Sequence, residues 1–254
     1  MTISGIIRAL CLCGLAAPAY ASHPLITDDT GTQGRNKVQL ELVGEYSRAE
    51  DAGVLTRTFV WPTMPVVSVG LLDSVDLVSG IAYQRATVSD AEGRVTRAGA
   101  TDLAVDVKWR LCERDGLALA LKPGLTIPTG DETKGLGAGR STQHLLIIAT
   151  KEAGPWKFHA NAGWTRNANR AGDREGLWHA SAAAARSIGK GWTAAVDAGA
   201  DTDPDPASRR TPVYALAGLI YSVSDRLDLD LGAKRSFNVS GSAHAFLAGM
   251  TVRF

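Results

Sequence analysis

The feature that most constrains this chain is an alternation of apolar and polar side chains, which starts at about Lys37 and continues to the last residue. Within residues 101–111 apolar side chains take one face and charged side chains the other: Leu103, Val105, Val107, Trp109 and Leu111 against Asp102, Asp106, Lys108 and Arg110. A period of two is that of a β-strand, whereas a helix would scatter these charges around its circumference. The alternation therefore predicts an all-β chain.

About twelve such segments follow one another, and no linker or change of composition divides them. We expect strands to begin near Lys37, Val54, Ser74, Ala98, Gly116, Arg140, Pro155, Glu175, Gly191, Thr211, Arg226 and Ser242. Connections after even-numbered strands are short, and those after odd-numbered strands are mostly longer, as at residues 86–97, 128–139 and 201–210. Short periplasmic turns and long extracellular loops are the layout of an antiparallel outer-membrane β-barrel.

Aromatic residues support the same prediction, because they fall near the strand ends. One set lies next to short turns or at the C-terminus: Trp109, Trp156, Trp192, Tyr221 and Phe254. The other set lies near the long loops: Tyr46, Trp61, Tyr83, Trp164, Trp178 and Tyr214. Membrane barrels carry such belts at both interfaces, whereas the core of a soluble sandwich would favour mid-strand positions. The terminal Phe254 also resembles the signal that barrels present to the barrel-assembly machinery, which we expect as a partner.

Residues 1–21 are typical of a secretory signal peptide, with Arg8, an apolar stretch over residues 9–17 and the small residues Ala19 and Ala21 before the cut. The alternatives are a short buried helix or a lipid-anchored N-terminus at Cys11 or Cys13. Cleavage before Ser22 leaves Cys112 as the last cysteine, so we expect no disulfide framework. Residues 22–36 then form a periplasmic arm or a small plug, and residues 37–254 form the barrel. For residues 27–30 a plug and a loose tether are equal expectations.

The charge balance excludes two other classes of protein. Lys and Arg number 27 and Asp and Glu 26, which gives a net charge of +1, so the chain lacks the basic excess of a nucleic-acid-binding protein. The mean hydropathy is −0.02 and no long apolar run is present, which excludes membrane-spanning helices. Alternating strands of a membrane barrel average to such a neutral hydropathy.

The polar faces of the strands predict the lining of the barrel lumen. The expected inward residues are Glu41, Glu45, Asp102, Asp106, Lys108, Arg110, Lys122, Lys157, His159, Asp197, Asp228, Asp230, Lys234 and Arg253. Acids and bases are balanced, so this lumen does not select ions of one sign. The alternative is that the charges pair across strands and only stabilise the interior. Twelve strands lie between a filled barrel of about eight and an open pore of 16–18, which is consistent with a narrow or gated pore.

Three further segments are candidates for functional roles. Pro123 interrupts an alternating strand and predicts either a gap in the wall, through which a hydrophobic solute leaves sideways, or a harmless bulge. The loop of residues 128–139, with Thr129, Gly130 and Asp131, is a candidate lid. Outer-membrane lipid and lipopolysaccharide are expected partners, with contacts from Arg166, Arg170 and Arg174 or, alternatively, a merely solvated loop. The acidic segment 201–206 is expected to be a solvated loop rather than a calcium site.

No motif indicates an enzyme, a cofactor or a metal site. Some outer-membrane barrels are hydrolases with a Ser/His pair, and the candidate pairs are His144 with Ser141, His179 with Ser181, and His244 with Ser242. Serines and histidines are common in strands and nothing in the sequence orients a triad. We therefore expect no enzymatic activity, no catalytic residues and no cofactor.

Several stretches resemble one known family. They are residues 22–34 followed by Val38-Gln-Leu-Glu-Leu42, then Lys122-Pro-Gly-Leu-Thr-Ile-Pro-Thr-Gly-Asp131 with a glycine-rich loop, and finally His159-Ala-Asn-Ala-Gly163. The chain is similar to the outer-membrane proteins named for the MetA pathway of phenol degradation. The resemblance implies a barrel related to channels for fatty acids and toluene, and it implies passage of small aromatic or other hydrophobic compounds. It supplies no binding residues.

The sequence thus predicts a barrel in the outer membrane of a Gram-negative bacterium that transports small, hydrophobic or aromatic solutes by passive diffusion. The alternative is a barrel that transports nothing and serves as an envelope-structural or surface-interaction protein. A lumen filled by side chains and the N-terminal arm would favour that alternative. A third hypothesis is a surface hydrolase, which requires a Ser/His contact on the outer wall.

Overall fold

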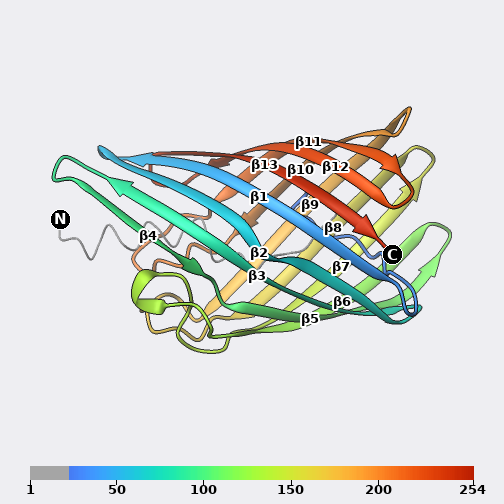
Figure 1. The fold of residues 1–254 in the computed structure, drawn as a ribbon, viewed down its shortest axis with the longest axis horizontal. Coiled ribbons are helices and arrows are strands. Elements are labelled where there is room, and N and C mark those ends of the chain that lie inside the picture. The colour runs from blue at the N-terminus through green and yellow to red at the C-terminus, as the bar shows by residue number, and fades with distance from the viewer. Residues whose placement is uncertain (1–22) are drawn as a thin grey trace.

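The computed structural model describes residues 23–254, apart from the side chains of residues 62–65, so the expected signal peptide lies outside the described residues. Almost all of this part is β-structure (Figure 1). The strands are β1 (Val38–Asp51), β2 (Val54–Leu72), β3 (Val75–Ser89), β4 (Arg94–Ala100), β5 (Leu103–Arg114), β6 (Leu117–Ile127), β7 (Gln143–Ala153), β8 (Trp156–Arg166), β9 (Gly176–Gly189), β10 (Trp192–Asp201), β11 (Val213–Ser224), β12 (Leu227–Phe237) and β13 (Ser242–Arg253). A single 3-10 turn, η2 (Glu132–Lys134), interrupts the loop after β6.

The strands close into one antiparallel barrel. Neighbouring strands pair in sequence order, and β1 pairs with β13, where Val38 and Phe254 exchange two backbone hydrogen bonds. Strands β4 and β5 share one place in the wall. The extracellular half of β3 pairs with β4, and the periplasmic half of β3 pairs with β5. The thirteen segments therefore make a closed barrel of twelve strands, which confirms the predicted fold class.

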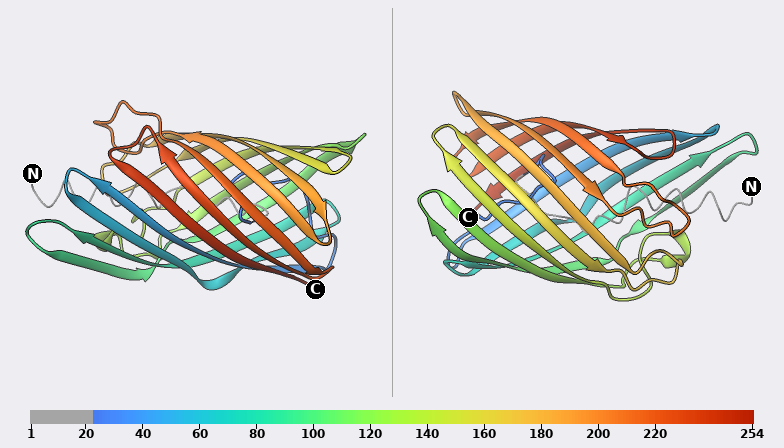
Figure 2. Two further views of the ribbon diagram at one scale, coloured as in Figure 1. Left: turned by 90° about the horizontal axis from the view of Figure 1, so that it is seen from above. Right: turned by 180° about the vertical axis from the view of Figure 1, so that it is seen from behind.

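The fourth strand is where the sequence prediction differs most from the structure. It was expected to begin near Ala98, but β4 begins at Arg94 and the strand is interrupted at Thr101 and Asp102. The expected long loop over residues 86–97 is therefore wrong in detail, since only residues 90–93 connect β3 to β4. Polar cross-strand contacts such as Thr87 with Thr96 continue the ladder beyond the apolar part of the wall. Irregular loops remain at residues 128–142, 167–175 and 202–212, gathered at the end away from the C-terminus (Figure 2).

Side chains alternate between the two surfaces of the barrel as a period of two requires. On β7, Ile148 is completely buried, whereas its neighbour Ile147 is 51% exposed on the outer wall. The exposed apolar side chains include aromatic pairs near the strand ends, such as Trp156 with Phe158. Within the described part of the chain, no helix is long and apolar enough to cross a membrane. The outer surface is therefore apolar and the polar side chains face inward.

This arrangement makes the cost of an outward charge depend on its depth. Leu231 lies on the outer wall four residues from the start of β12, and Val223 lies on the same surface next to a periplasmic turn. We expect Leu231→Arg to lower the free energy of unfolding in lipid vesicles by about 2–4 kcal/mol, and Val223→Arg by about 0–1 kcal/mol. Equilibrium denaturation checks this, and equal losses at both positions would contradict a membrane-embedded wall.

Candidate functional site: the barrel interior and the N-terminal arm

The N-terminal arm, residues 23–36, lies inside the barrel and follows its inner wall. It is bound in turn by side chains from β12, β10, β8, β7 and β3, which are Asp230, Asp197, Asn161, Thr150 and Asp76. Asn36 then donates from its backbone to Gly70 at the periplasmic end of β2. The arm therefore runs round the inner wall of the periplasmic half of the barrel, from β12 by way of β8 to β2.

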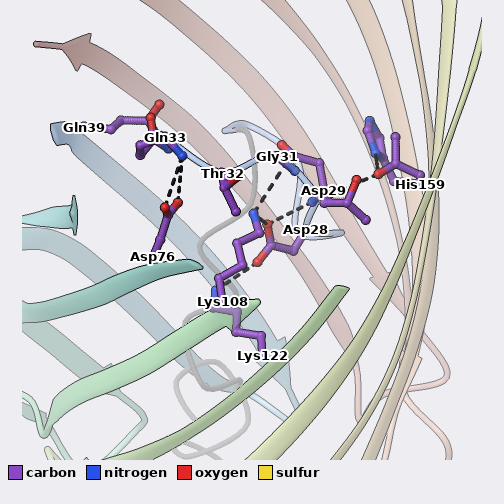
Figure 3. Close-up of polar contacts among 12 residues, drawn as sticks. Asp28, Asp29, Gly31, Thr32, Gln33, Gln39, Asp76, Lys108, Lys122 and His159 are labelled. Atoms are coloured by element: carbon purple, nitrogen blue, oxygen red, sulfur yellow. Dashed lines mark hydrogen bonds and ion pairs between the residues drawn. The ribbon is translucent and has the colours of Figure 1, made fainter. Parts of the chain in front are cut away.

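Asp28 is the central contact of the arm (Figure 3). Its carboxylate is fully buried and accepts hydrogen bonds from Lys108 Nζ and Lys122 Nζ, each at 2.9 Å. Its backbone N–H donates to Asn161 Oδ1 at 2.6 Å, and its backbone oxygen accepts from Asn161 Nδ2 at 2.9 Å. Removing one partner of a buried ion pair typically costs about 3–5 kcal/mol, because the other charge is left unpaired. Asp28 thus fixes the middle of the arm to β5, β6 and β8.

Asp197 holds the preceding turn of the arm. Its carboxylate accepts from the backbone N–H of Ile26 at 2.7 Å and of Thr27 at 2.8 Å, and from the Thr27 hydroxyl at 2.7 Å. The Tyr214 hydroxyl, on the neighbouring strand, donates to the same carboxylate at 3.1 Å. Buried polar groups need such partners, and here the arm's unpaired backbone groups are satisfied by the wall.

Glycines in the wall make room for the start of the arm. A Cβ added at Gly218 or Gly232 would collide with the ring of Pro24, and one at Gly249 would collide with His23 and Asp230. Only residues without a side chain let the backbone of the arm approach the strands so closely. Leu25 then packs into an apolar cluster of the inner wall, with Leu216 and Leu247 among its members.

The predicted lumen residues separate into groups by height. Four hold the arm directly: Lys108, Lys122, Asp197 and Asp230. Three are buried beside them: Glu41, Asp106 and His159. Glu45 and Lys234 form an ion pair of 3.0 Å in the extracellular half. Four form ion pairs towards the periplasmic rim, where Arg110 pairs with Glu113, Lys157 with Glu152, and Asp228 with Arg253.

Asp102, the last of the predicted residues, anchors a loop instead of lining open space. Its carboxylate accepts from the backbone N–H of Gly130 at 2.9 Å and of Ala138 at 2.8 Å. The loop of residues 128–141 is thereby held against the interrupted strand, with the Leu136 side chain beside Gly99. Thr129 ties the loop to β5 by accepting from the Leu103 N–H.

The remaining candidate lid residue, Asp131, caps η2. Hydrogen bonds from Thr133 and Lys134 lower the pKa of Asp131 to about 2. The carboxylate therefore stays charged at neutral pH and stabilises the turn inside the loop. This interaction orders the loop itself rather than closing the lumen.

A cavity of about 220 Å³ lies above the arm in the extracellular half of the barrel. Ile26 forms part of its floor, and Thr202, Pro204 and Pro212 border it at the outer end. Residues 128–141 are not among its lining residues, so the candidate lid does not cover it. The cavity combines apolar walls with polar groups such as His144, His179 and Tyr214. Such a mixture suits a small organic molecule with limited polarity.

Two histidines of this cavity are oriented by carboxylates. His144 Nε2 forms a 2.7 Å hydrogen bond with Asp106. His179 Nδ1 bonds to Asp201 at 2.7 Å, and its Nε2 bonds to the Ser181 hydroxyl at 2.9 Å. Ser181 is buried inside the barrel, so this Ser/His contact is not the outer-wall contact that a surface hydrolase requires.

The other two hydrolase candidates do not form a Ser/His contact in the structure. The Ser141 hydroxyl donates to the Thr126 backbone oxygen, and His244 lies on the outer wall against the ring of Phe246. In the described part of the chain, no group of three or more His, Cys, Asp or Glu side chains is placed to hold a metal ion. The interior is thus a binding surface for the arm and for the contents of the cavity.

The pairing between β5 and β6 is interrupted at Lys122 and Pro123, which have no partner on β5 in the ladder. On either side of this interruption, Asp106 pairs with Gly124 and Trp109 with Leu121 in one unchanged register. Pro123 also keeps its place opposite Leu145 of β7. A larger irregularity lies at β4, which has one strand neighbour among the described residues, namely β3.

Sequence reasoning missed Asn161, Thr150 and Asp76, which bind the arm although they were not among the predicted lumen residues. Asn161 shares the polar face of β8 with His159, so the alternation would have placed it inward, whereas β7 around Thr150 is apolar on both faces. The alternation could not predict the glycines that make room for the arm, because a glycine fits either face of a strand.

Comparison with known proteins adds family and fold. The sequence model of the family described as "Putative MetA-pathway of phenol degradation" matches residues 21–254. No curated protein sequence is significantly similar.

Among solved structures, the COG4313 outer membrane channel from Pseudomonas putida F1 is similar with a TM-score of 0.65 and 16% identity, covering 89% of this chain and 98% of that one. The CymD monoaromatic hydrocarbon channel has a TM-score of 0.51 and 8% identity, covering 87% and 89%. The translocator domain of the autotransporter NalP from Neisseria meningitidis has a TM-score of 0.54 and 12% identity, covering 98% and 96%. At these identities the likeness establishes the outer-membrane barrel fold.

The contacts of Asp197 predict how firmly the arm is held. In a Cys112→Ser background, we expect Thr27→Cys to react slowly with a membrane-impermeant maleimide, since residue 27 is completely buried. Adding Asp197→Ala removes several charge-assisted hydrogen bonds and should speed labelling at least about tenfold, which corresponds to about 1.4 kcal/mol. Asp228→Ala is the control, because Asp228 pairs with Arg253 at the rim. Equal labelling rates in all variants would show that Asp197 does not retain the arm.

Proposed function

Because the chain belongs to the family described as "Putative MetA-pathway of phenol degradation", we propose that it is an outer-membrane channel for passive diffusion of small hydrophobic or aromatic solutes. The cavity above the arm is the observation that carries this proposal. The COG4313 and CymD proteins, which share the fold, are named as an outer membrane channel and a monoaromatic hydrocarbon channel. A cleaved signal peptide would deliver the chain, and Phe254 would present it to the assembly machinery.

The size of the cavity fits a solute with a single ring. A protein cavity of roughly 150 Å³ lined by apolar side chains is enough to bind benzene. The present cavity, at about 220 Å³, would hold a monocyclic aromatic with a small substituent. Its apolar walls favour the ring, and the imidazole of His144, which Asp106 orients through Nε2, offers its Nδ1 to a hydroxyl group.

A solute in this cavity has two routes onward. The direct route leads to the periplasm and requires the arm to move, because the arm lines the inner wall along this route. The lateral route leads through the wall beside β4, where the loop of residues 128–141 lies in place of a further strand. Pro123, where the sequence predicts a gap or a bulge, is paired with Leu145 of β7 but has no partner on β5, so it is a second position for a lateral route.

The arm also favours a second candidate function, that of a barrel which transports nothing. Asp28 of the arm binds two lysines of the wall, and Asp197 of the wall binds the backbone of the arm. A segment held in this way would fill part of the lumen permanently. The two functions differ in whether the arm ever leaves its place. Conductance measurements separate them.

Releasing the arm should open an aqueous path. In planar lipid bilayers we expect small or rare unitary steps from the wild type, and steps at least about tenfold more frequent from Asp28→Asn combined with Asp197→Asn. The double substitution keeps the side-chain volumes but removes the two carboxylates that hold the arm. Asp228→Asn serves as the matched control at the rim. Persistent silence from the folded double variant would mean that the arm is not the barrier of a channel.

A disulfide across the β4 seam tests the lateral route. A side chain at Gly99 would touch the end of the Leu136 side chain, so Gly99→Cys with Leu136→Cys puts two thiols on facing positions. In a Cys112→Ser background, oxidation should slow uptake of radiolabelled toluene several-fold, and reduction should restore it. The single variants control for the loss of Leu136. Uptake that is the same before and after oxidation would exclude the lateral route.

A further inference from the structure

A row of basic side chains crosses the outer wall where β12, β13, β1 and β2 lie side by side. Arg235 is opposite His244, His244 is opposite Arg48, and Arg48 is opposite Arg57. Neighbouring strands are about 4.8 Å apart, so these four residues occupy adjacent positions. The residues that alternate with them, such as Ser47, are buried inside the barrel. We call Arg48, Arg57, Arg235 and His244 the basic patch.

The basic patch lies directly on the extracellular side of an apolar row. Two residues nearer the periplasm on the same strands are Ala233, Phe246, Tyr46 and Phe59, which are paired in the same order. Phe246 is 59% exposed and Tyr46 is 40% exposed on the outer wall. Aromatic belts mark the level where hydrocarbon meets the polar headgroups. The basic patch is therefore placed at the headgroup level of the outer leaflet.

The distance along the strands gives the same level. Arg48 comes ten residues after Val38, the first residue of β1, and Arg235 comes eight residues after Leu227, the first of β12. At about 3.3 Å per residue and a strand tilt of about 40°, these positions are roughly 20–25 Å from the periplasmic end of the wall. The apolar band of a bacterial barrel is about 25 Å tall.

Most of the charge of the basic patch is left for an outside partner. Glu50 is the one acid that the structure pairs with it, through a 3.0 Å bond from Arg48, and both side chains are about half exposed. The Arg235 guanidinium lies over the ring of Phe237, 5.6 Å from its centre, which orients it along the wall. In the extracellular half of the wall, the outer faces of β7, β9, β10 and β11 carry uncharged side chains, among them Leu145, Trp178, Ala198 and Ala215.

The loop arginines expected from the sequence to meet lipopolysaccharide are mostly engaged within the protein. Arg170 donates to Glu132 at 2.9 Å. Arg174 donates to the backbone oxygens of Asp203, Pro206 and Ser208, which orders the loop after β10. These two side chains support neighbouring loops, whereas the basic patch has no comparable internal role.

We propose that the basic patch binds the phosphate groups of lipid A in the outer leaflet, with the acyl chains lying along the apolar row beneath it. This inference rests on the outer-membrane location of the proposed function, not on the solute. Guanidinium groups bind phosphate oxygens by paired hydrogen bonds, and several in a row match a lipid that carries more than one phosphate. The charge sign, the membrane level and the adjacent apolar surface all fit this one lipid.

Native mass spectrometry of the protein extracted from outer membranes in detergent tests the proposal with bisphosphorylated lipid A as the probe. The patch variant carries Arg48→Gln, Arg57→Gln and Arg235→Gln, and the control variant carries Arg114→Gln, Arg186→Gln and Arg209→Gln, where Arg114 lies beside Asp115 at a periplasmic turn. Both lose three positive charges. We expect the patch variant to bind lipid A about tenfold or more weakly, and the control to stay within about twofold of the wild type. Heat-modifiable electrophoretic mobility verifies that each variant is folded.

Other outcomes would overturn the proposal. Equal binding by the patch and control variants would mean that the acyl chains alone hold the lipid. Wild-type protein that binds dephosphorylated lipid A as tightly would lead to the same conclusion. Displacement of the lipid by millimolar inorganic phosphate would indicate a general anion site.

A triple Arg→Lys variant that recovers part of the affinity would support recognition by charge. Single-channel conductance of the patch variant should be unchanged, so a failed channel proposal and a failed lipid site are distinguishable.

Discussion

The pairing of every backbone polar group is the constraint on which the rest of this structure depends. Hydrocarbon offers no hydrogen bonds, so the wall must close, and β1 and β13 close it through Val38 and Phe254. Once the outer surface is apolar, the polar half of each strand has only the lumen to occupy. The buried carboxylates and lysines of the interior follow from this division, and they in turn require partners.

The N-terminal arm supplies many of those partners. Three carboxylates of the wall accept hydrogen bonds from the arm, namely Asp197, Asp230 and Asp76. In the other direction, the carboxylate of Asp28 in the arm accepts from Lys108 and Lys122 of the wall. The polar groups of the wall and of the arm are therefore each other's hydrogen-bond partners, and several of them would lose a partner if the arm left. In the channel proposed above the arm is the barrier, because the interactions that stabilise the interior also hold the arm in the periplasmic half of the lumen.

The sequence predicted the wall well and the contents of the barrel poorly. Alternation placed most strand starts within three residues, since a strand that faces lipid on one side has little freedom of register. The interruption at Thr101 and Asp102 was missed because polar residues near the extracellular end extend a strand as readily as they end it. The arm's path depends on glycines such as Gly218 and on distant partners such as Asn161, contacts across more than a hundred residues that no local pattern encodes.

The two surfaces of the wall use charge in opposite ways. Inside, Lys108 and Lys122 are paired with Asp28 at 2.9 Å, whereas Asp76, Asp102 and Asp197 accept from backbone N–H groups. Outside, the basic patch gathers positive charge on β12, β13, β1 and β2 in the extracellular half of the wall, where Glu50 is the acid paired with it. A charged group on an outer wall is tolerated only where headgroups or their counter-charges meet it. The position of the basic patch therefore marks the upper limit of the hydrocarbon on that side of the barrel.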